Sequence, residues 1–207
     1  MSSTNILYKI RPMTKHDIDQ VVGVHLESFK GFFLTFLGRR FLRVFYSFMI
    51  FDAKSISIVA EYGQNNQVIA FVVGALEPSS FYSRAIRARI FQFACASFPA
   101  FIKNPRILGR LIRALVKPKE MKTIPADCEL MSIAVLPQYA NQGIGRELEA
   151  FFINEAKRHN VHAITLTTDK FHNDGANKFY EKCGYVVYNT YVTPEGREMN
   201  RYIKILS

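Results

Sequence analysis

The stretch from 129 to 145 constrains the fold of this chain more than any other part of it. Residues 130–135 are apolar and partly β-branched, and Pro137 follows them, as expected for a buried strand that ends there. Apolar residues then recur every fourth position, which predicts an amphipathic helix over about 144–159. Between the two lies a Gly-x-Gly turn at 143–145. A strand, a glycine turn and a helix N-terminus together present free N–H groups, so the sequence predicts an anion site here.

Two familiar phosphate-binding loops do not fit this turn. A dinucleotide-binding loop requires a third glycine where Leu148 stands, and a P-loop requires Lys followed by Ser or Thr where Arg146 and Glu147 stand. A second segment downstream supplies a better match: residues 173–180 read Asn-Asp-Gly-Ala-Asn-Lys-Phe-Tyr. The two segments together resemble the acyl-CoA site of the GNAT superfamily of N-acetyltransferases.

This resemblance implies a GNAT fold of the α/β (α+β) type. Its mixed central sheet has splayed central strands flanked by helices, and this chain would add a basic helical insertion between the third and fourth strands. The resemblance also implies acetyl-CoA as co-substrate. The turn would bind the diphosphate, the strand edge would pair with the pantetheine arm, and an N–H near Ile133 or Ala134 would stabilise the oxyanion. The cofactor-binding residues implied are Ile133, Ala134, Val135, Gln142, Gly143, Ile144, Gly145, Arg146, Asn173, Ala176 and Phe179.

The chain departs from the family pattern Arg/Gln-x-x-Gly-x-Gly/Ala at two positions. Ala140 stands at the first position, and Asn141 stands where a glycine usually follows. The change removes a side chain but leaves the backbone donors, so we expect acetyl-CoA binding to survive.

The same resemblance implies two catalytic residues, Tyr180 and Glu129. Tyr180 has the place of the family's tyrosine, and a phenol of pKa about 10 can protonate a departing thiolate. Its alternative role is that of a core tyrosine on an amphipathic helix. Glu129 would act as a general base, through water or with a raised pKa, and its alternative is a solvated carboxylate at a strand end. Asn173 would hold the CoA arm or serve as a helix N-cap. His25, Glu195 and Arg197 are weaker candidates for contacting the acceptor.

Local patterns predict the remaining elements in chain order. Thr14 to Asp17 matches a capping box, and Gly184 stands where a left-handed helix cap is needed. The predicted strands are 8–11, 55–61, 67–76, 162–167, 185–191 and 197–206. One predicted helix begins after the capping box at 14–17, and two others cover about 38–49 and 173–182.

The net charge of +10 is concentrated in one segment. Residues 81–123 contain ten Lys/Arg and one acid, which gives +9 of that total. The pattern predicts two basic amphipathic helices, 82–98 and 105–116, separated by Pro99 and Asn104-Pro105. Such a segment is a solvated face, a site for an anionic ligand, or a contact with an anionic membrane surface. Nucleic acid is not expected, because the arginines do not accompany a recognisable binding fold.

Composition favours one domain spanning 1–207, with the insertion at 81–123. There is no apolar run of about 20 residues and no signal-peptide pattern, so the expected location is cytoplasmic. Three cysteines without metal-like spacing are expected to be reduced thiols, and no metal is expected.

The sequence therefore predicts an N-acetyltransferase that moves an acetyl group to a primary amine through a direct ternary complex. The acceptor would be a small molecule, for example a phosphorylated or nucleotide-linked amino sugar. The alternatives are a protein or peptide amine, or a non-catalytic acyl-CoA-binding module with a membrane-surface insertion. The oligomeric state is left open.

Overall fold

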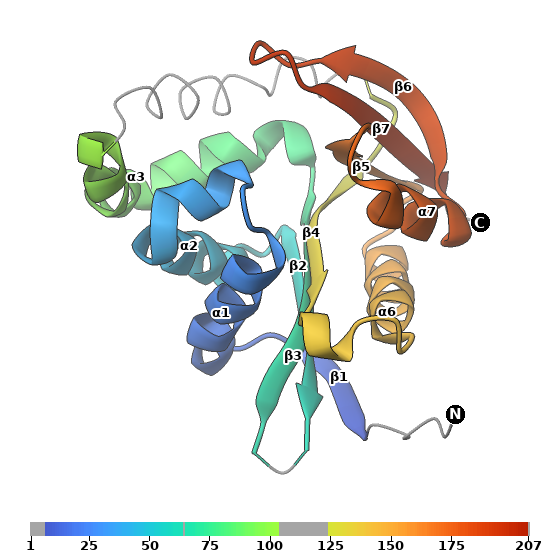
Figure 1. Ribbon diagram of the computed structural model, residues 1–207, viewed down its shortest axis with the longest axis horizontal. Coiled ribbons are helices and arrows are strands. Elements are labelled where there is room, and N and C mark those ends of the chain that lie inside the picture. Colours follow the sequence, from blue (N-terminus) through green and yellow to red (C-terminus); the bar gives the residue numbers. More distant parts are fainter. Residues whose placement is uncertain (1–6, 64, 104–123, 207) are drawn as a thin grey trace.

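The computed structural model describes residues 7–63, 65–103 and 124–206 (Figure 1). Its single seven-stranded sheet has the order β1-β2-β3-β4-β5-β7-β6, in which β4 and β5 are parallel and the other neighbours antiparallel. The strands are β1 (Tyr8–Pro12), β2 (Ser55–Tyr62), β3 (Gln67–Leu76), β4 (Cys128–Val135), β5 (Ala163–Asp169), β6 (Val186–Val192) and β7 (Glu198–Ile205). The helices are α1 (Ile18–Ser28), α2 (Phe33–Phe51), α3 (Pro78–Lys103), α6 (Ile144–Arg158) and α7 (Asp174–Lys182), with short 3-10 helices at Lys15–Asp17 and Pro137–Tyr139.

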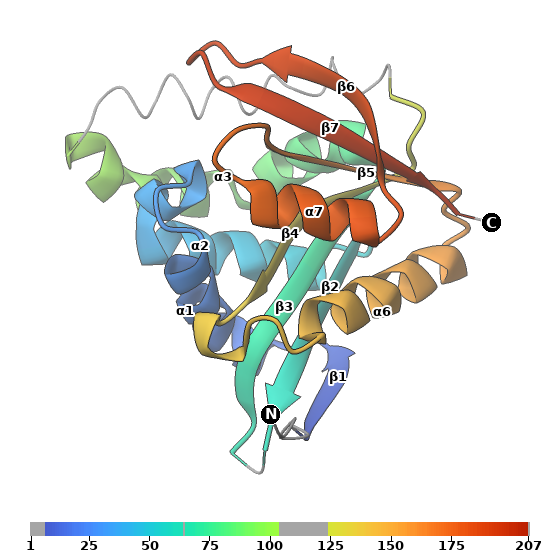
Figure 2. The same ribbon diagram turned by 45° about the vertical axis from the view of Figure 1, so that its right-hand side comes forward.

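Helices cover both faces of the sheet. Helices α1, α2 and α3 lie on one side, while α6 and α7 lie on the other (Figures 1 and 2). Apolar residues of α6 recur every fourth position and are fully buried, as the sequence predicted for Leu148, Phe152 and Ala156. The mixed sheet flanked by helices confirms the predicted fold class.

Strands β4 and β5 separate soon after they begin. Only Cys128 with Ile164 and Glu129 with Thr165 are paired, although β4 continues to Val135. Figure 2 shows the two strands diverging beyond this point. The splay leaves one edge of β4 open over its second half.

A β-bulge precedes the open edge of β4. Ser132 pairs with Val73 and Leu130 pairs with Gly74, so Met131 is an extra residue between them. A bulge of this kind bends the strand and re-aims the side chains beyond it.

The insertion differs from the prediction in its helical boundaries. Helix α3 runs through Pro99 and departs from helical geometry at Arg89 instead, with φ −145° and ψ 27°. The predicted break at Pro99 is wrong. Pro99 is on the exposed side of the helix, while Ala96 and Ala100 on the other side are buried and hold it in place. The second predicted helix, 105–116, lies outside the described residues.

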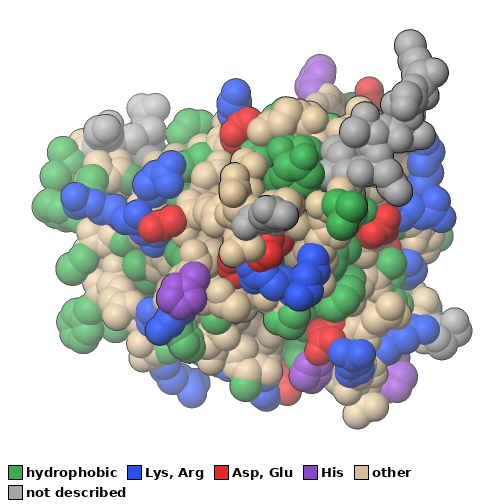
Figure 3. Space-filling model, turned by 90° about the horizontal axis from the view of Figure 1, so that it is seen from below, with side chains coloured by type: hydrophobic (Ala, Val, Ile, Leu, Met, Phe, Trp, Pro, Cys, Tyr) green, Lys and Arg blue, Asp and Glu red, His purple; other side chains and the backbone are tan. Residues whose placement is uncertain are grey.

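The second half of α3 exposes several large apolar side chains. Phe91 is 84% exposed, and Ile90, Phe98 and Ile102 are also exposed. Seen from below, hydrophobic and Lys/Arg side chains alternate along the edge of the molecule that carries α2 and α3 (Figure 3). None of the helices in the described part of the chain combines the length and hydropathy that crossing a membrane requires.

Candidate active site

A cavity of about 440 Å³ opens where β4 separates from β5. Strand β4, the following loop, the start of α6 and one side of α7 form its walls. Most of the residues that the sequence predicted to bind acetyl-CoA come together here. The lining residues are Ile133, Ala134, Val135, Tyr139, Ala140, Asn141, Gly143, Ile144, Gly145, Arg146, Gly175, Ala176, Phe179 and Tyr180.

The loop before α6 is shaped by two left-handed residues. Gly143 is the N-cap of α6 with φ 85°, a conformation that favours glycine. Asn141 has φ 60°, so it adopts the backbone geometry that a glycine would take at this position. Asparagine tolerates this region better than most residues. Asn141 therefore adopts a left-handed conformation that a glycine at this position could also take.

The N-terminus of α6 presents backbone donors to the cavity. The first N–H groups of an α-helix have no acceptor within the helix, and no side chain caps this one. Gly145 faces the ring of Phe179, and a Cβ at this glycine would lie 3.4 Å from it. The helix dipole adds partial positive charge at the same place. The arrangement suits a phosphate group.

The open edge of β4 forms the opposite wall. Ile133, Ala134 and Val135 pair with β3 on one side only, since β5 has already diverged. An extended ligand could hydrogen-bond to the free side of this strand as an added strand would.

Tyr180 is half-buried at the cavity and belongs to an aromatic cluster. Its ring centroid lies 5.3 Å from that of Phe179 and 5.9 Å from that of Tyr185. Burial raises the pKa of Tyr180 above its ordinary value, and the nearby Cys183 raises it further. The phenol is therefore protonated at neutral pH and can act as a proton donor.

Two predicted cofactor-binding residues do not line the cavity. Gln142 is exposed, and its side chain donates to the backbone carbonyl of Gln138 at 3.4 Å. Asn173 is the N-cap of α7, but its Nδ2 donates to Thr168 Oγ1 at 2.5 Å instead of its side chain capping the helix.

Glu129 lies at the last position where β4 and β5 are paired, outside the cavity lining. It approaches Tyr82 of α3. Burial raises the pKa of Tyr82, and its proximity to Glu129 and Tyr191 raises it further. These three side chains therefore lie near one another, on the side of the sheet that carries α3.

The weaker candidates have other contacts. His25 is 2% exposed, and its Nδ1 lies 2.6 Å from the hydroxyl of Tyr46. Burial lowers the pKa of His25 to about 4, so the imidazole is neutral. Arg197 forms an ion pair with Asp169.

Sequence reasoning missed Arg201, which is 6% exposed on β7. Its guanidinium stacks on the ring of Tyr191, with a distance of 4.7 Å from Cζ to the centroid. The sequence did contain a signal. Met199, Arg201 and Ile203 are alternate residues of one predicted strand and so share a face, and a charged side chain is unusual between two apolar ones on a buried face.

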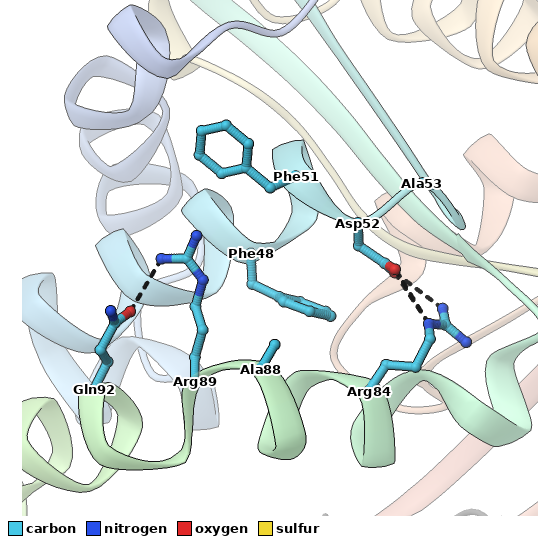
Figure 4. A pocket seen from close by; sticks show the side chains of 8 residues that line it. All are labelled: Phe48, Phe51, Asp52, Ala53, Arg84, Ala88, Arg89 and Gln92. Atoms are coloured by element: carbon cyan, nitrogen blue, oxygen red, sulfur yellow. Dashed lines mark hydrogen bonds and ion pairs between the residues drawn. The ribbon is translucent and has the colours of Figure 1, made fainter.

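A second cavity, of about 490 Å³, lies between α2 and α3 (Figure 4). Arg84 reaches across it to Asp52 at 3.0 Å, and Arg89 donates to Gln92 at 3.0 Å. Phe51 lies beside Arg89, 5.7 Å from Cζ to the ring centroid. These two arginines of the insertion are thus engaged at α2 and the start of β2, away from the splayed strands.

Comparison with known proteins identifies the family. The model of the acetyltransferase (GNAT) family matches residues 25–185, so the chain belongs to this family of enzymes, whose members transfer an acetyl group from acetyl-CoA to an amine. No curated protein sequence matches the chain.

Similar solved structures agree in fold. The ribosomal-protein-S18-alanine N-acetyltransferase of Escherichia coli is 16% identical over 97% of this chain and 95% of its own, with a TM-score of 0.60. An N-acetyltransferase of Staphylococcus aureus is 14% identical over 97% and 99%, with a TM-score of 0.62. A Bacillus anthracis protein, provisionally designated a streptothricin acetyltransferase and crystallised with acetyl coenzyme A, is 19% identical over 78% and 68%, with a TM-score of 0.51.

Proposed function

We propose that this chain transfers an acetyl group from acetyl-CoA to the primary amine of a small molecule through a direct ternary complex. The observation that carries the proposal is the cavity at the splay. It combines the donor-rich N-terminus of α6, the open edge of β4 and the phenol of Tyr180. A thioester bound along that edge would have an anion site at one end and a proton donor at the other.

The cofactor would be held mainly by backbone groups. The N–H groups of residues 142–145 would bind the diphosphate, whereas that of Arg146 already donates to the carbonyl of Gly143 at 3.0 Å. The open edge at 133–135 would pair with the pantetheine arm. An N–H near Ile133 or Ala134 would donate to the oxygen that becomes negative when the amine attacks. Side chains of the loop then matter less than its backbone, so the substitutions at Ala140 and Asn141 are compatible with binding.

The proton transfers fall to Tyr180 and Glu129. Attack requires a neutral amine, and Glu129 would accept the excess proton through water. Tyr180 would donate its proton to the departing CoA thiolate. The raised pKa of Tyr180 keeps the donor protonated until the thiolate forms.

We further propose an acceptor that carries phosphate, such as a phosphorylated or nucleotide-linked amino sugar. The net charge of +10 favours an anionic acceptor. The same charge disfavours basic peptide tails, although the similar E. coli protein is named for acetylating a protein alanine.

The test is calorimetric titration with acetyl-CoA, followed by an amine panel monitored by release of free thiol. We expect micromolar binding of acetyl-CoA by the wild type. The Tyr180→Phe variant should bind acetyl-CoA within twofold of the wild type but lose about a hundredfold or more in kcat. Tyr188→Phe, at an exposed tyrosine of β6, is the matched control and should change neither. Acetyl-CoA binding without turnover of any amine would favour the non-catalytic module.

A further inference from the structure

Arg201 is a buried cation that forms no ion pair with any residue that the structure describes. Its Nε is buried and has no hydrogen-bond acceptor among the described residues, and no described carboxylate forms an ion pair with it. Removing a guanidinium from water is costly unless hydrogen bonds and an opposite charge replace the lost hydration. The contact with Tyr191 covers one face of the guanidinium but gives its N–H groups no acceptor.

Other buried charges in the described part of the chain are paired. Asp17 forms an ion pair with Arg11 at 2.7 Å, and Glu149 forms one with Lys204 at 3.1 Å. Arg201 departs from this pattern. A buried charge without a partner among the residues at 7–63, 65–103 and 124–206 suggests that a ligand supplies the partner.

The strand register places Arg201 on the same face of the sheet as Glu129. Glu129 pairs with Thr165 of β5, and Thr167 lies two residues further along that strand on the same face. Thr167 in turn pairs with Arg201 of β7. The Cα atoms of Glu129 and Arg201 are therefore about 12 Å apart, because two strand spacings across the sheet and two residues along a strand separate them.

This face is turned away from α7. The neighbouring residue Tyr202 points to the opposite side, where its hydroxyl donates to Asn177 of α7 at 2.9 Å. Tyr191 pairs with Met199, two residues before Arg201, and so shares the face of Arg201. Proximity to both Glu129 and Tyr191 helps to raise the pKa of Tyr82 of α3, which puts α3 over the same area.

We propose that Arg201 binds the anionic group, phosphate or carboxylate, of the acceptor amine. This inference rests on the proposed function and assigns the recognition of the anion to one residue. With Glu129 near the amine and Arg201 at the anion, the site selects a small molecule whose two groups are several ångströms apart. A guanidinium suits this task because its planar fork can donate two hydrogen bonds to one phosphate or carboxylate.

The experiment compares three related ligands by calorimetry: glucosamine, glucosamine 6-phosphate and 2-amino-2-deoxyglucuronate. The wild type should bind one of the anionic amines at least tenfold more tightly than glucosamine. Arg201→Gln should remove that preference, with a loss of roughly ten- to a hundredfold for the anionic ligand and less than twofold for glucosamine. Arg201→Lys should keep part of it. Comparing the affinities for the two anionic ligands shows whether Arg201 prefers a phosphate or a carboxylate.

Controls separate this proposal from a structural role and from failure of the proposed function. Arg158→Gln, at an exposed arginine of α6, should leave the preference unchanged. An equal loss for charged and neutral amines in Arg201→Gln would make Arg201 structural and overturn the proposal, as would a wild type without preference for either anion. Failure of the proposed function would appear separately, as absence of acetyl-CoA binding to the wild type.

Discussion

Replacing Gly74 with alanine should destabilise the protein at the start of the splay. Gly74 belongs to β3, beside the bulge of β4. A Cβ at this position would lie 2.7 Å from the carbonyl oxygen of Glu129 and closer still to the ring of Phe152. Phe152 is fully buried, so its ring cannot turn away without disturbing the packing of α6.

The expected cost follows from these two contacts. Overpacking a core costs about 1–3 kcal/mol, and the upper end applies here because one contact is with backbone. A loss of about 3 kcal/mol lowers the Tm of a domain of this size by about 6–12 °C. Relief of the clash would also displace Glu129, so kcat should fall while the Kd for acetyl-CoA, whose predicted site lies further along β4, stays within about twofold.

The assays are urea denaturation, thermal unfolding and steady-state kinetics of Gly74→Ala. Gly23→Ala, in the middle of α1, is the matched control, because a Cβ built there meets no atom within 4 Å apart from its chain neighbours and the backbone of its own helix. That variant should gain about 0.5–1 kcal/mol through higher helix propensity. If Gly74→Ala unfolds within 0.5 kcal/mol of the wild type, the contact between β3, Phe152 and Glu129 is looser than described and the reasoning fails.

Three further predictions concern the loop and two buried groups. Asn141→Gly should leave the Kd for acetyl-CoA within about threefold of the wild type. Asn141→Val should raise that Kd more than tenfold, since a β-branched residue is strained at φ 60°. Equal affinities of the two variants would contradict this reasoning. Burial lowers the pKa of His25 to about 4, so the unfolded chain takes up a proton at this residue before the folded chain does as the pH falls. The free energy of unfolding should therefore drop by about 3 kcal/mol between pH 6.5 and pH 4. Urea denaturation of His25→Gln should show a smaller drop over the same range. Lys204→Met should lower the free energy of unfolding by about 3 kcal/mol, because it leaves Glu149 buried and unpaired. Adding Glu149→Leu should recover most of that loss. No recovery in the double variant would show that the ion pair is not the cause.

Local sequence patterns were enough to predict most of the elements. Strand β3 has the predicted boundaries, and most others differ by one or two residues. Apolar residues at every second position of a strand, or every fourth position of a helix, reflect which side of the element is buried. These patterns can be recognised without knowing which element packs against that side. Gly184 is left-handed as predicted, with φ 84°.

Features that depend on distant partners could not be read in this way. The bulge at Met131 results from the register of β3 against β4, and the splay from how soon β5 diverges. No local pattern encodes either of them; the splay was expected only because the chain resembles the family. The left-handed conformation of Asn141 was likewise hidden, because an asparagine in a loop adopts several conformations with similar ease.

The helix α3 shows what charge patterning alone could not predict about the insertion. The basic residues were compatible with a solvated face, a site for an anionic ligand or a contact with an anionic membrane surface. In the described part, Arg84 is paired with Asp52 and Phe91 is exposed. Apolar residues occur all around the second half of α3, so the helix has a packed side and an exposed apolar side, and composition gives no way to tell which is which.

The difference between buried and exposed charges explains why Arg201 alone can matter more for the choice of acceptor than the ten Lys/Arg of the insertion. Two charges about 4 Å apart interact by about 1 kcal/mol in water but about 4 kcal/mol at the lower effective dielectric constant near a protein interior. Exposed charges are also screened over about 8 Å at physiological ionic strength, whereas a buried pair is screened much less. If the insertion selects the acceptor, the preference for an anionic amine should disappear as salt is raised from 0.05 to about 0.5 M. If Arg201 selects it, most of the preference should persist at high salt, since the anion then meets a guanidinium that is 6% exposed.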